Sequence, residues 1–443
     1  MPRLALRFAA LSLTFAAAYA EAPAQANGRF PRAQQLVISR TDPSRMFLRA
    51  TFGVIASTDG GQRWRWLCEQ AMGFSGSWDP PIAIAPHQEL VVGLTEGLAT
   101  TADGCTMHTT LAGELVSDLS VTTTGDLMLA LSTPGKPATV RVRNAAGQLS
   151  PAGAGLPGVY IDTLDAAPSR PSRVYATGIR VGASPEPHLF VSNDRGATLR
   201  ELHPKLEAQG RLFLSAIDPR DPDHIFIRAL GESGSDLIVS RDGGASFRLA
   251  LHLDGAMQGF AMSPDGQRVW VGSTDPKQGI YRSRDGGETF TQGARLVVYC
   301  LAYAANTLYA CSEAFRPDGF AVGVSHDDGT TVAPLARFSD VEGPVRCDAG
   351  AGARCDGEPW AQMHATLAAV SAPAPELDAP PSQPDAARSP SPPADARAPA
   401  PGRACACSVP TSAAPPPTSL GAFFALALAG LGRRSRSARV DRS

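Results

Sequence analysis

The octapeptide Ser283-Arg284-Asp285-Gly286-Gly287-Glu288-Thr289-Phe290 decides how this chain folds. The residues before it, Ile280-Tyr281-Arg282, have the apolar and aromatic character that strands prefer. An aspartate here can accept bonds from its own turn, and two glycines supply the positive φ of a tight reversal. Thr289 and Phe290 then begin another strand. The stretch therefore predicts a strand, a tight turn and a second strand.

The same turn recurs along the chain, which predicts a repeat protein. The aspartates of the recognisable copies stand at 59, 103, 194, 242, 285 and 327, and the copy at 101–108 is worn. Successive gaps are 44, 91, 48, 43 and 42 residues. Because 91 is about twice the other gaps, we expect one decayed copy, best placed at 143–147. Seven such units predict an all-β fold, a single β-propeller of seven four-stranded blades.

The repeated turn needs no ligand to account for its composition. An aspartate and two glycines satisfy the backbone groups of a tight turn. We therefore expect the residues that recur in each copy of the turn to have a structural role and not a catalytic one. The residues given this role are Ser57, Asp59, Gly61, Trp64, Asp103, Ser192, Asp194, Gly196, Ser240, Asp242, Gly244, Phe247, Ser283, Asp285, Gly287, Phe290, Ser325, Asp327 and Gly329.

The turn resembles the Asp-box (BNR) repeat, whose pattern is Ser-x-Asp-x-Gly-x-Thr-Trp/Phe. The resemblance covers about residues 30–340 and implies boxes on the outer turns of a propeller, remote from its central funnel. Sialidases are the best-known enzymes with such boxes, but Arg29-Phe30-Pro31-Arg32 matches their Phe-Arg-Ile-Pro motif only loosely. In size and blade count the chain is more similar to single-propeller assembly factors, which implies a non-catalytic binding platform.

The sequence before and after the propeller predicts export. Arg3 and Arg7, a short apolar run and Ala18-Tyr19-Ala20 are typical of a cleaved signal peptide. Near the other end, Pro/Ala/Ser-rich sequence is unable to bury a core and predicts a disordered spacer. The expected segments are a signal peptide at 1–20, the propeller at 27–345, a disulfide-closed extension at 346–370, the spacer at 371–403 and a sorting or anchor segment at 404–443.

The last segment joins Cys405 and Cys407 to a short apolar helix candidate at 420–431 and a terminal arginine cluster. It resembles the C-terminal sorting signals of myxobacterial surface proteins (MYXO-CTERM type). That resemblance implies cleavage near one of these cysteines, a lipid on it, and display on the envelope of a Gram-negative cell or release from it. The alternative is a permanent anchor, although the apolar run is short for a membrane span.

Eight cysteines in an exported chain favour disulfides. Around an Ala305-Asn306 turn, Cys300 and Cys311 face each other in an antiparallel pair, close enough to bridge. We also expect Cys347–Cys355, which would close a small Gly/Ala loop, and the remaining pair Cys68–Cys105. The alternative is a metal site, which the absence of zinc-type spacing disfavours.

Enzyme and nucleic-acid signatures are missing from the sequence. It has no nucleophile elbow, His-Glu-x-x-His motif or phosphate loop, and its net charge of −2 comes without a basic stripe. The spacing of Asp218, Asp221 and Asp223 suggests calcium ligands, but interleaved prolines favour a turn. We expect no cofactor and no metal.

Asp118 and Asp162 are the only catalytic candidates. Both are expected near the starts of innermost strands, where a carboxylate pair would serve as acid and nucleophile. The favoured interpretation is nevertheless an exported, monomeric, surface-displayed propeller that binds a protein or glycan at its funnel or rim without catalysis. The alternative is a secreted glycoside hydrolase of sialidase type.

Overall fold

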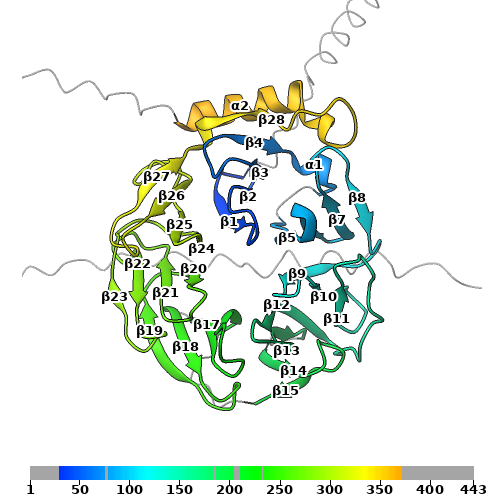
Figure 1. The fold of residues 1–443 in the computed structure, drawn as a ribbon, viewed down its shortest axis with the longest axis vertical. Coiled ribbons are helices and arrows are strands. Elements are labelled where there is room, and N and C mark those ends of the chain that lie inside the picture. The colour runs from blue at the N-terminus through cyan, green and yellow to red at the C-terminus, as the bar shows by residue number, and fades with distance from the viewer. Residues whose placement is uncertain (1–28, 75–77, 183–185, 204–209, 232, 372–443) are drawn as a thin grey trace, which may run out of the picture. The chain divides into compact units, whose positions relative to one another are not determined.

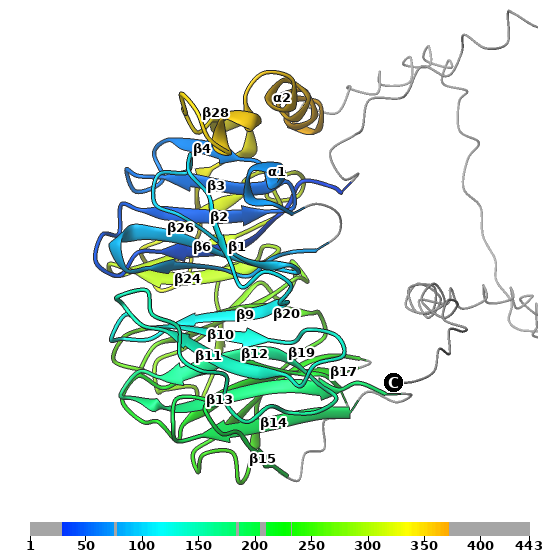
Figure 2. The ribbon, with the colours of Figure 1, turned by 90° about the vertical axis from the view of Figure 1, so that its right-hand side faces the viewer.

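Seven small antiparallel sheets surround one axis, so the chain folds as a seven-bladed β-propeller (Figure 1). The computed structural model describes residues 29–74, 78–182, 186–203, 210–231 and 233–371. Seen edge-on, the strands run roughly along the axis (Figure 2). The predicted all-β fold and the number of blades are confirmed.

Each blade is built from consecutive strands, numbered from the axis outward. Blade I is β1 (Ala33–Ile38), β2 (Met46–Ala50), β3 (Gly53–Ser57) and β4 (Trp64–Leu67); blade II is β5 (Ile82–Ala85), β6 (Glu89–Leu94), β7 (Gly97–Thr101) and β8 (His108–Thr110); blade III is β9 (Val116–Val121), β10 (Leu127–Leu131) and β11 (Thr139–Arg143); blade IV is β12 (Val159–Ala167), β13 (Arg170–Arg180), β14 (Glu186–Ser192) and β15 (Arg200–Leu202). Blade V is β16 (Leu212–Ile217), β17 (Ile225–Gly231), β18 (Gly234–Ser240) and β19 (Arg248–Leu253); blade VI is β20 (Met257–Met262), β21 (Val269–Ser273), β22 (Ile280–Ser283) and β23 (Thr291–Gln292); blade VII is β24 (Cys300–Ala304), β25 (Thr307–Cys311), β26 (Val322–Ser325) and β27 (Ala333–Ala336).

A few elements stand outside this pattern. They are the helices α1 (Glu69–Met72) and α2 (Glu358–Ser371), the 3-10 helices η1 (Pro86–Gln88), η2 (Phe338–Asp340) and η3 (Gly352–Cys355), and the strand β28 (Val341–Pro344). Among the residues described, no helix is long and apolar enough to cross a membrane. The predicted signal peptide, spacer and sorting segment, with Cys405 and Cys407, lie outside the described residues.

Blade III departs from the four-stranded plan at the decayed repeat. The turn after β11 is closed by Asn144, whose side chain accepts a bond from Gln148 N at 2.9 Å, and Gly147 has a φ of +81°. The next segment pairs with the blade only through two isolated bridges, Ala138–Leu156 and Arg143–Leu149. A turn therefore survives at the predicted place, while the outermost strand is reduced to these bridges.

The repeated turns also help neighbouring blades pack together. Gly287 has a φ of +84°, and a Cβ added there would lie 2.6 Å from a ring carbon of Phe226 in the preceding blade. Glycine is thus required both for the turn conformation and for this close approach. Around Phe226, buried side chains of blades V and VI, including Leu237 and Val269, form one apolar cluster. Such clusters between blades make up the core.

The ring closes between blades I and VII, and a C-terminal strand joins the sheet of blade I as its fifth, outermost strand. β1 lies against β24 of blade VII, and β28 then pairs in parallel with β4 on the outside of blade I (Figure 1). Val345 N extends this pairing by donating to Trp66 O at 2.8 Å. Helix α2 adds Met363 and Leu367 to the buried core. We call residues 341–371 the C-terminal strap.

Two disulfides fasten the strap to the start of the ring. Cys68 is joined to Cys355, and Cys105 to Cys347. The predicted pairs Cys68–Cys105 and Cys347–Cys355 are therefore wrong. The reason is that the strap passes blade I and blade II in turn, so that each of its cysteines meets a partner more than 240 residues earlier, at separations of 287 and 242.

The third disulfide is the one that the hairpin register predicted. Cys300 and Cys311 are paired residues of β24 and β25, with Cα atoms 4.8 Å apart. The turn residues Ala305 and Asn306 both have positive φ, as a two-residue hairpin turn of this type requires.

Candidate functional site

The strand directions divide the propeller into two faces. Within a blade the first and third strands start at one face, and each repeated turn follows a third strand at the other. We call these the start face and the box face. Residues at the beginning of an innermost strand, or at the end of a second strand, therefore lie toward the start face.

Asp118 lies in β9 and Asp162 in β12, so both sequence candidates are on innermost strands of adjacent blades. Asp118 Oδ2 accepts a bond of 2.7 Å from Leu164 N and so ties β9 to β12. Deeper in the same pair of strands, Ser120 Oγ donates to Asp165 Oδ1 at 2.5 Å. Carboxylates thus connect two inner strands that are not paired in one sheet.

Asp162 forms an ion pair with an arginine of the next blade. Arg211, directly before β16, donates from Nε to Asp162 Oδ2 at 2.9 Å and from Nη2 to the other oxygen. The Asp162 side chain is only 3% exposed, whereas that of Arg211 is 44% exposed. Arg211 and Arg228 both lie over the ring of Phe213, at 5.5 and 4.3 Å from its centroid.

Arg49 and Arg228, unlike Arg211, donate to backbone carbonyl oxygens and not to a carboxylate. Arg228 Nη1 donates to Met257 O at 2.5 Å, and Arg49 Nη1 donates to Asp79 O and Pro80 O at 3.1 and 2.9 Å. In both arginines Nε is buried without a hydrogen-bond partner in the described structure. Among the described residues neither forms an ion pair, although Arg29 and Asp79 beside Arg49 form a bidentate pair at 2.7 and 2.6 Å.

These groups influence one another electrostatically, and we call them together the axial belt. Burial raises the pKa of Asp118 to about 7, and the charges of Asp165 and Asp162 add to that rise. Burial also lowers the pKa of Arg49 to about 10, and that of Arg228 to about 10, where the charge of Arg211 adds to the fall. The belt consists of Arg29, Arg49, Asp79, Asp118, Tyr160, Asp162, Arg211, Phe213 and Arg228.

Sequence reasoning missed the belt arginines, although a signal for two of them is visible in hindsight. Met46-Phe47-Leu48-Arg49-Ala50 and Ile225-Phe226-Ile227-Arg228-Ala229 begin β2 and β17 in the same way. The equivalent fourth positions of the other blades hold Gly93, Ala130, Thr177, Gly272 and Cys311. An arginine within an otherwise apolar strand is unusual, since burying its charge is costly.

The box face carries the repeated turns, and their aspartates are engaged within those turns. Asp285 Oδ1 accepts bonds from Ser283 Oγ, Glu288 N and Thr289 N at 2.6, 3.0 and 3.0 Å, and Thr289 Oγ1 donates to Oδ2 at 2.5 Å. The turn at Asp242 is built alike, and bonds from Ser246 lower the pKa of Asp242 to about 2.

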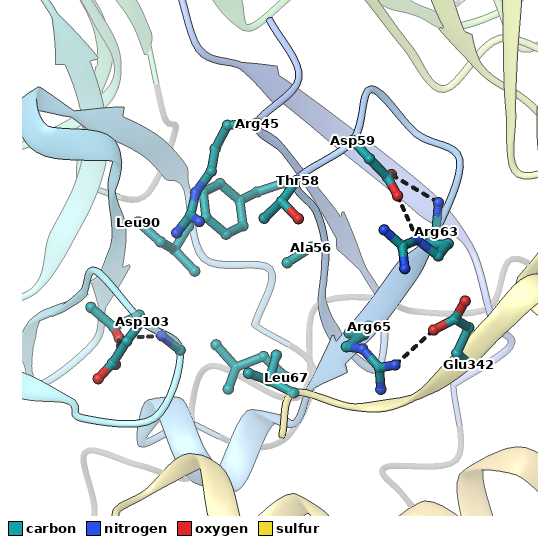
Figure 3. A pocket seen from close by; sticks show the side chains of 14 residues that line it. Arg45, Ala56, Thr58, Asp59, Arg63, Arg65, Leu67, Leu90, Asp103 and Glu342 are labelled. Atoms are coloured by element: carbon teal, nitrogen blue, oxygen red, sulfur yellow. Dashed lines mark hydrogen bonds and ion pairs between the residues drawn. The ribbon is translucent and has the colours of Figure 1, made fainter. Parts of the chain in front are cut away.

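The box face also has two pockets between blades. One, of about 220 Å³, lies between blades I and II beside the strap, where Arg45, Arg63 and Arg65 surround a hollow (Figure 3). Another, of about 390 Å³, lies between blades VI and VII and is lined by residues that include Arg268, Tyr303 and Asp328.

Metal-type groupings are not seen in the part of the chain that the structure describes. The three aspartates considered for calcium belong to one turn. Asp218 accepts bonds from the backbone of Arg220 and from Asp221 N at 2.8 and 3.3 Å, and its other oxygen lies 3.0 Å from His224 Nδ1.

Comparison with known proteins shows no family for this chain. No family model matches the sequence. No curated protein matches it either. Solved structures that resemble the chain include hydrazine synthase of Kuenenia stuttgartiensis (13% identity, 65% of this chain and 94% of that chain, TM-score 0.47), the GH74 xyloglucanase of Xanthomonas campestris (15%, 70% and 59%, 0.37) and the extracellular domain of a hybrid two-component system of B. thetaiotaomicron (10%, 67% and 38%, 0.48).

The match spans less than two thirds of the length of the last two of these proteins. Identities this low say nothing about activity. The seven-bladed fold rests on the strand pairing described above, and function has to be argued from the residues of this chain.

Proposed function

We propose that this protein is an exported propeller that binds a carboxylate-bearing glycan, without catalysis, at the axial belt. The observation that carries the proposal is the pair Arg49 and Arg228, which are fixed by backbone carbonyls and form no ion pair among the described residues. A guanidinium held in this way presents its remaining donors to an anion, and carboxylates are the group it binds bidentately.

The rest of the belt suits a sugar better than a bare anion. Asp162 holds the half-exposed Arg211 in place, Arg211 offers a donor to hydroxyl groups, and Phe213 and Tyr160 offer aromatic rings beside them. Binding sites of this kind combine apolar contact with a few fixed polar groups. The belt is also assembled from blades I, III, IV and V, so a ligand there would touch several blades at once.

Export is supported by the three disulfides, since such bonds persist in oxidising compartments. Cleavage of residues 1–20, display through the 371–403 spacer, and processing at Cys405 or Cys407 remain parts of the proposal that rest on the sequence alone. The structural role of the box aspartates is likewise proposed, and it is supported by the bonds within their own turns.

Calorimetric titration of the purified protein tests the binding proposal. Oligogalacturonides serve as the acidic probe, and neutral galacto-oligosaccharides of equal length serve as the control. We expect binding of the acidic series alone, weakened about tenfold or more in Arg49→Gln and Arg228→Gln because each removes a charged donor. Arg200→Gln, an exposed change on β15, is the matched control. Equal binding of neutral and acidic sugars, or unchanged binding in both belt variants, would contradict the proposal.

Glycoside hydrolysis is kept as a second candidate because of one specific observation. Asp118, with its pKa raised to about 7, keeps a substantial protonated fraction near neutral pH, as a general acid needs, while Asp162 pairs with Arg211. Turnover of aryl glycosides, including a sialoside, distinguishes the candidates. Activity that is lost in a folded Asp118→Asn or Asp162→Asn variant would replace the binding proposal with the enzymatic one.

A further inference from the structure

The pocket between blades I and II lies at the opposite face from the axial belt. Its walls are the turn of the box at Asp59, the turn of the box at Asp103, and the strap residues Glu342 and Val345. Figure 3 shows Arg45 on one side of the hollow and Arg63 and Arg65 on the other, with Ala56 and Leu67 between them. The strap therefore forms part of the wall of this pocket.

Arg45 in blade I and Arg268 in blade VI occupy equivalent positions, and only Arg268 faces a carboxylate. Arg45 stands directly before β2 and lies over Phe47 at 5.1 Å, and Arg268 stands directly before β21 and lies over Trp270 at 5.6 Å. In the blade VI/VII pocket, Arg268 faces Asp328, at 3.8 Å between Nη1 and Oδ1. Asp328 immediately follows the box aspartate Asp327, and at that position the box of blade II has Gly104.

The missing carboxylate leaves Arg45 without an anionic partner. Arg45 Nη2 donates to Ala102 O at 2.8 Å, and its Nε is buried with no hydrogen-bond partner among the described residues. Nor does any described carboxylate form an ion pair with it. Burial lowers the pKa of Arg45, an effect that only the charge of Asp42 opposes.

The other charges around the pocket are already matched. Arg63 Nε donates to Asp59 Oδ2 at 2.7 Å, and Arg65 Nη2 donates to Glu342 Oε2 at 2.7 Å. Asp103 Oδ1 accepts bonds from Cys105 N and Thr106 N within its own turn, at 2.7 and 2.8 Å. One guanidinium therefore remains uncompensated in a pocket whose walls also include the apolar side chains of Phe47, Leu67, Leu90 and Val345.

We propose that this pocket binds a small organic carboxylate, whose anionic group takes at Arg45 the place that Asp328 takes beside Arg268. The volume of about 220 Å³ admits a short chain and not an oligomer. An apolar chain of a few carbons would cover Leu67, Leu90 and Val345 while the carboxylate bonds Arg45. Since the ligand would touch blade I, blade II and the strap together, its binding stabilises the closed ring.

Thermal denaturation of the purified full chain tests this, with butyrate as the probe and butyramide as its uncharged control. We expect butyrate to raise Tm in a saturable way and butyramide to leave it unchanged. Arg45→Gln should weaken the butyrate response about tenfold or more. Arg268→Gln, the matched change in the blade VI/VII pocket, should keep the response. A response shared by butyramide, or retained in a folded Arg45→Gln variant, overturns the proposal.

The internal repeat also supplies a gain-of-charge test. Gly104→Asp places a carboxylate where blade VII has Asp328, which adopts a similar positive φ of 67° against 76° for Gly104. It should abolish the butyrate response, whereas Gly104→Asn, of the same size, should keep a weakened one.

Arg228→Gln tests whether butyrate binds at the axial belt and not in this pocket. If that change removed the butyrate response, the ligand would belong to the belt and the pocket proposal would fail.

Discussion

At the residue scale, carboxylates of this propeller occupy two opposite environments. Asp242 is exposed in its turn and receives hydrogen bonds that lower its pKa to about 2. Asp118 lies among inner strands, where burial raises its pKa to about 7. Folding therefore favours the ionised form of Asp242 and the protonated form of Asp118. The two kinds of site respond to pH in opposite directions.

We predict that Asp118→Asn stabilises the protein above pH 7 and has little effect near pH 4. The ordinary pKa of the group is 3.8 and its folded value is about 7. Between these values the folded state binds more protons than the unfolded state, so the stability contributed by Asp118 falls as pH rises through this window. The amide oxygen of asparagine keeps an acceptor for Leu164 N, and it carries no buried charge.

Urea denaturation at pH 4, 6 and 8 measures this effect. We expect a gain of about 1–4 kcal/mol at pH 8, since each unit of pKa shift corresponds to about 1.4 kcal/mol. Asp348→Asn, at an exposed position in the strap, is the control and should show no such trend. A gain that is equal at all three pH values would show that the charge of Asp118 is not its cause.

At the element scale, the repeated turn allowed the fold to be predicted from the sequence. An Asp-Gly-Gly turn after an apolar strand is a local signal, and its spacing counts the blades whatever the tertiary contacts are. The Cys300–Cys311 hairpin was readable for the same reason, because its register follows from a two-residue turn. Only part of the axial belt could be predicted from the sequence. Asp118 and Asp162 lie near the starts of innermost strands, where candidates were sought. Arg49 and Arg228 lie in the second strands of blades I and V, where none were sought.

We predict that the turn bonds of Asp285 contribute measurably to stability. Asp285→Ala removes the acceptor of several bonds and should lower the unfolding free energy by about 1–3 kcal/mol. Thr289→Val removes only the 2.5 Å bond to Oδ2 and should cost about 1 kcal/mol. Thr289→Ser is the matched control, because Ser246 makes the equivalent bond to Asp242. Equal urea midpoints for all three variants would contradict this role.

At the scale of the whole molecule, closure of the ring depends on residues that are far apart in the chain. The strap lies outside blade I, and its cysteines bridge separations of 287 and 242 residues. No local pattern encodes such contacts, so sequence reasoning paired the nearer cysteines and was wrong. The path of the strap depends instead on surfaces such as that of Trp66, whose ring lies 5.9 Å from Trp360 of α2.

We predict that the two strap disulfides stabilise the propeller more than the hairpin disulfide does. In the chain-entropy account, a bridge that closes a longer loop restricts the unfolded chain more, and removing a native bridge costs about 2–5 kcal/mol. Cys68→Ala/Cys355→Ala and Cys105→Ala/Cys347→Ala should therefore lower Tm more than Cys300→Ala/Cys311→Ala, whose cysteines are 11 residues apart. Losing both strap bridges should also let trypsin cut after Arg346 and Arg354 while the blades stay intact. An equal or larger loss from the hairpin pair, or a strap that resists trypsin without its bridges, would show that β28 and α2 close the ring by packing alone.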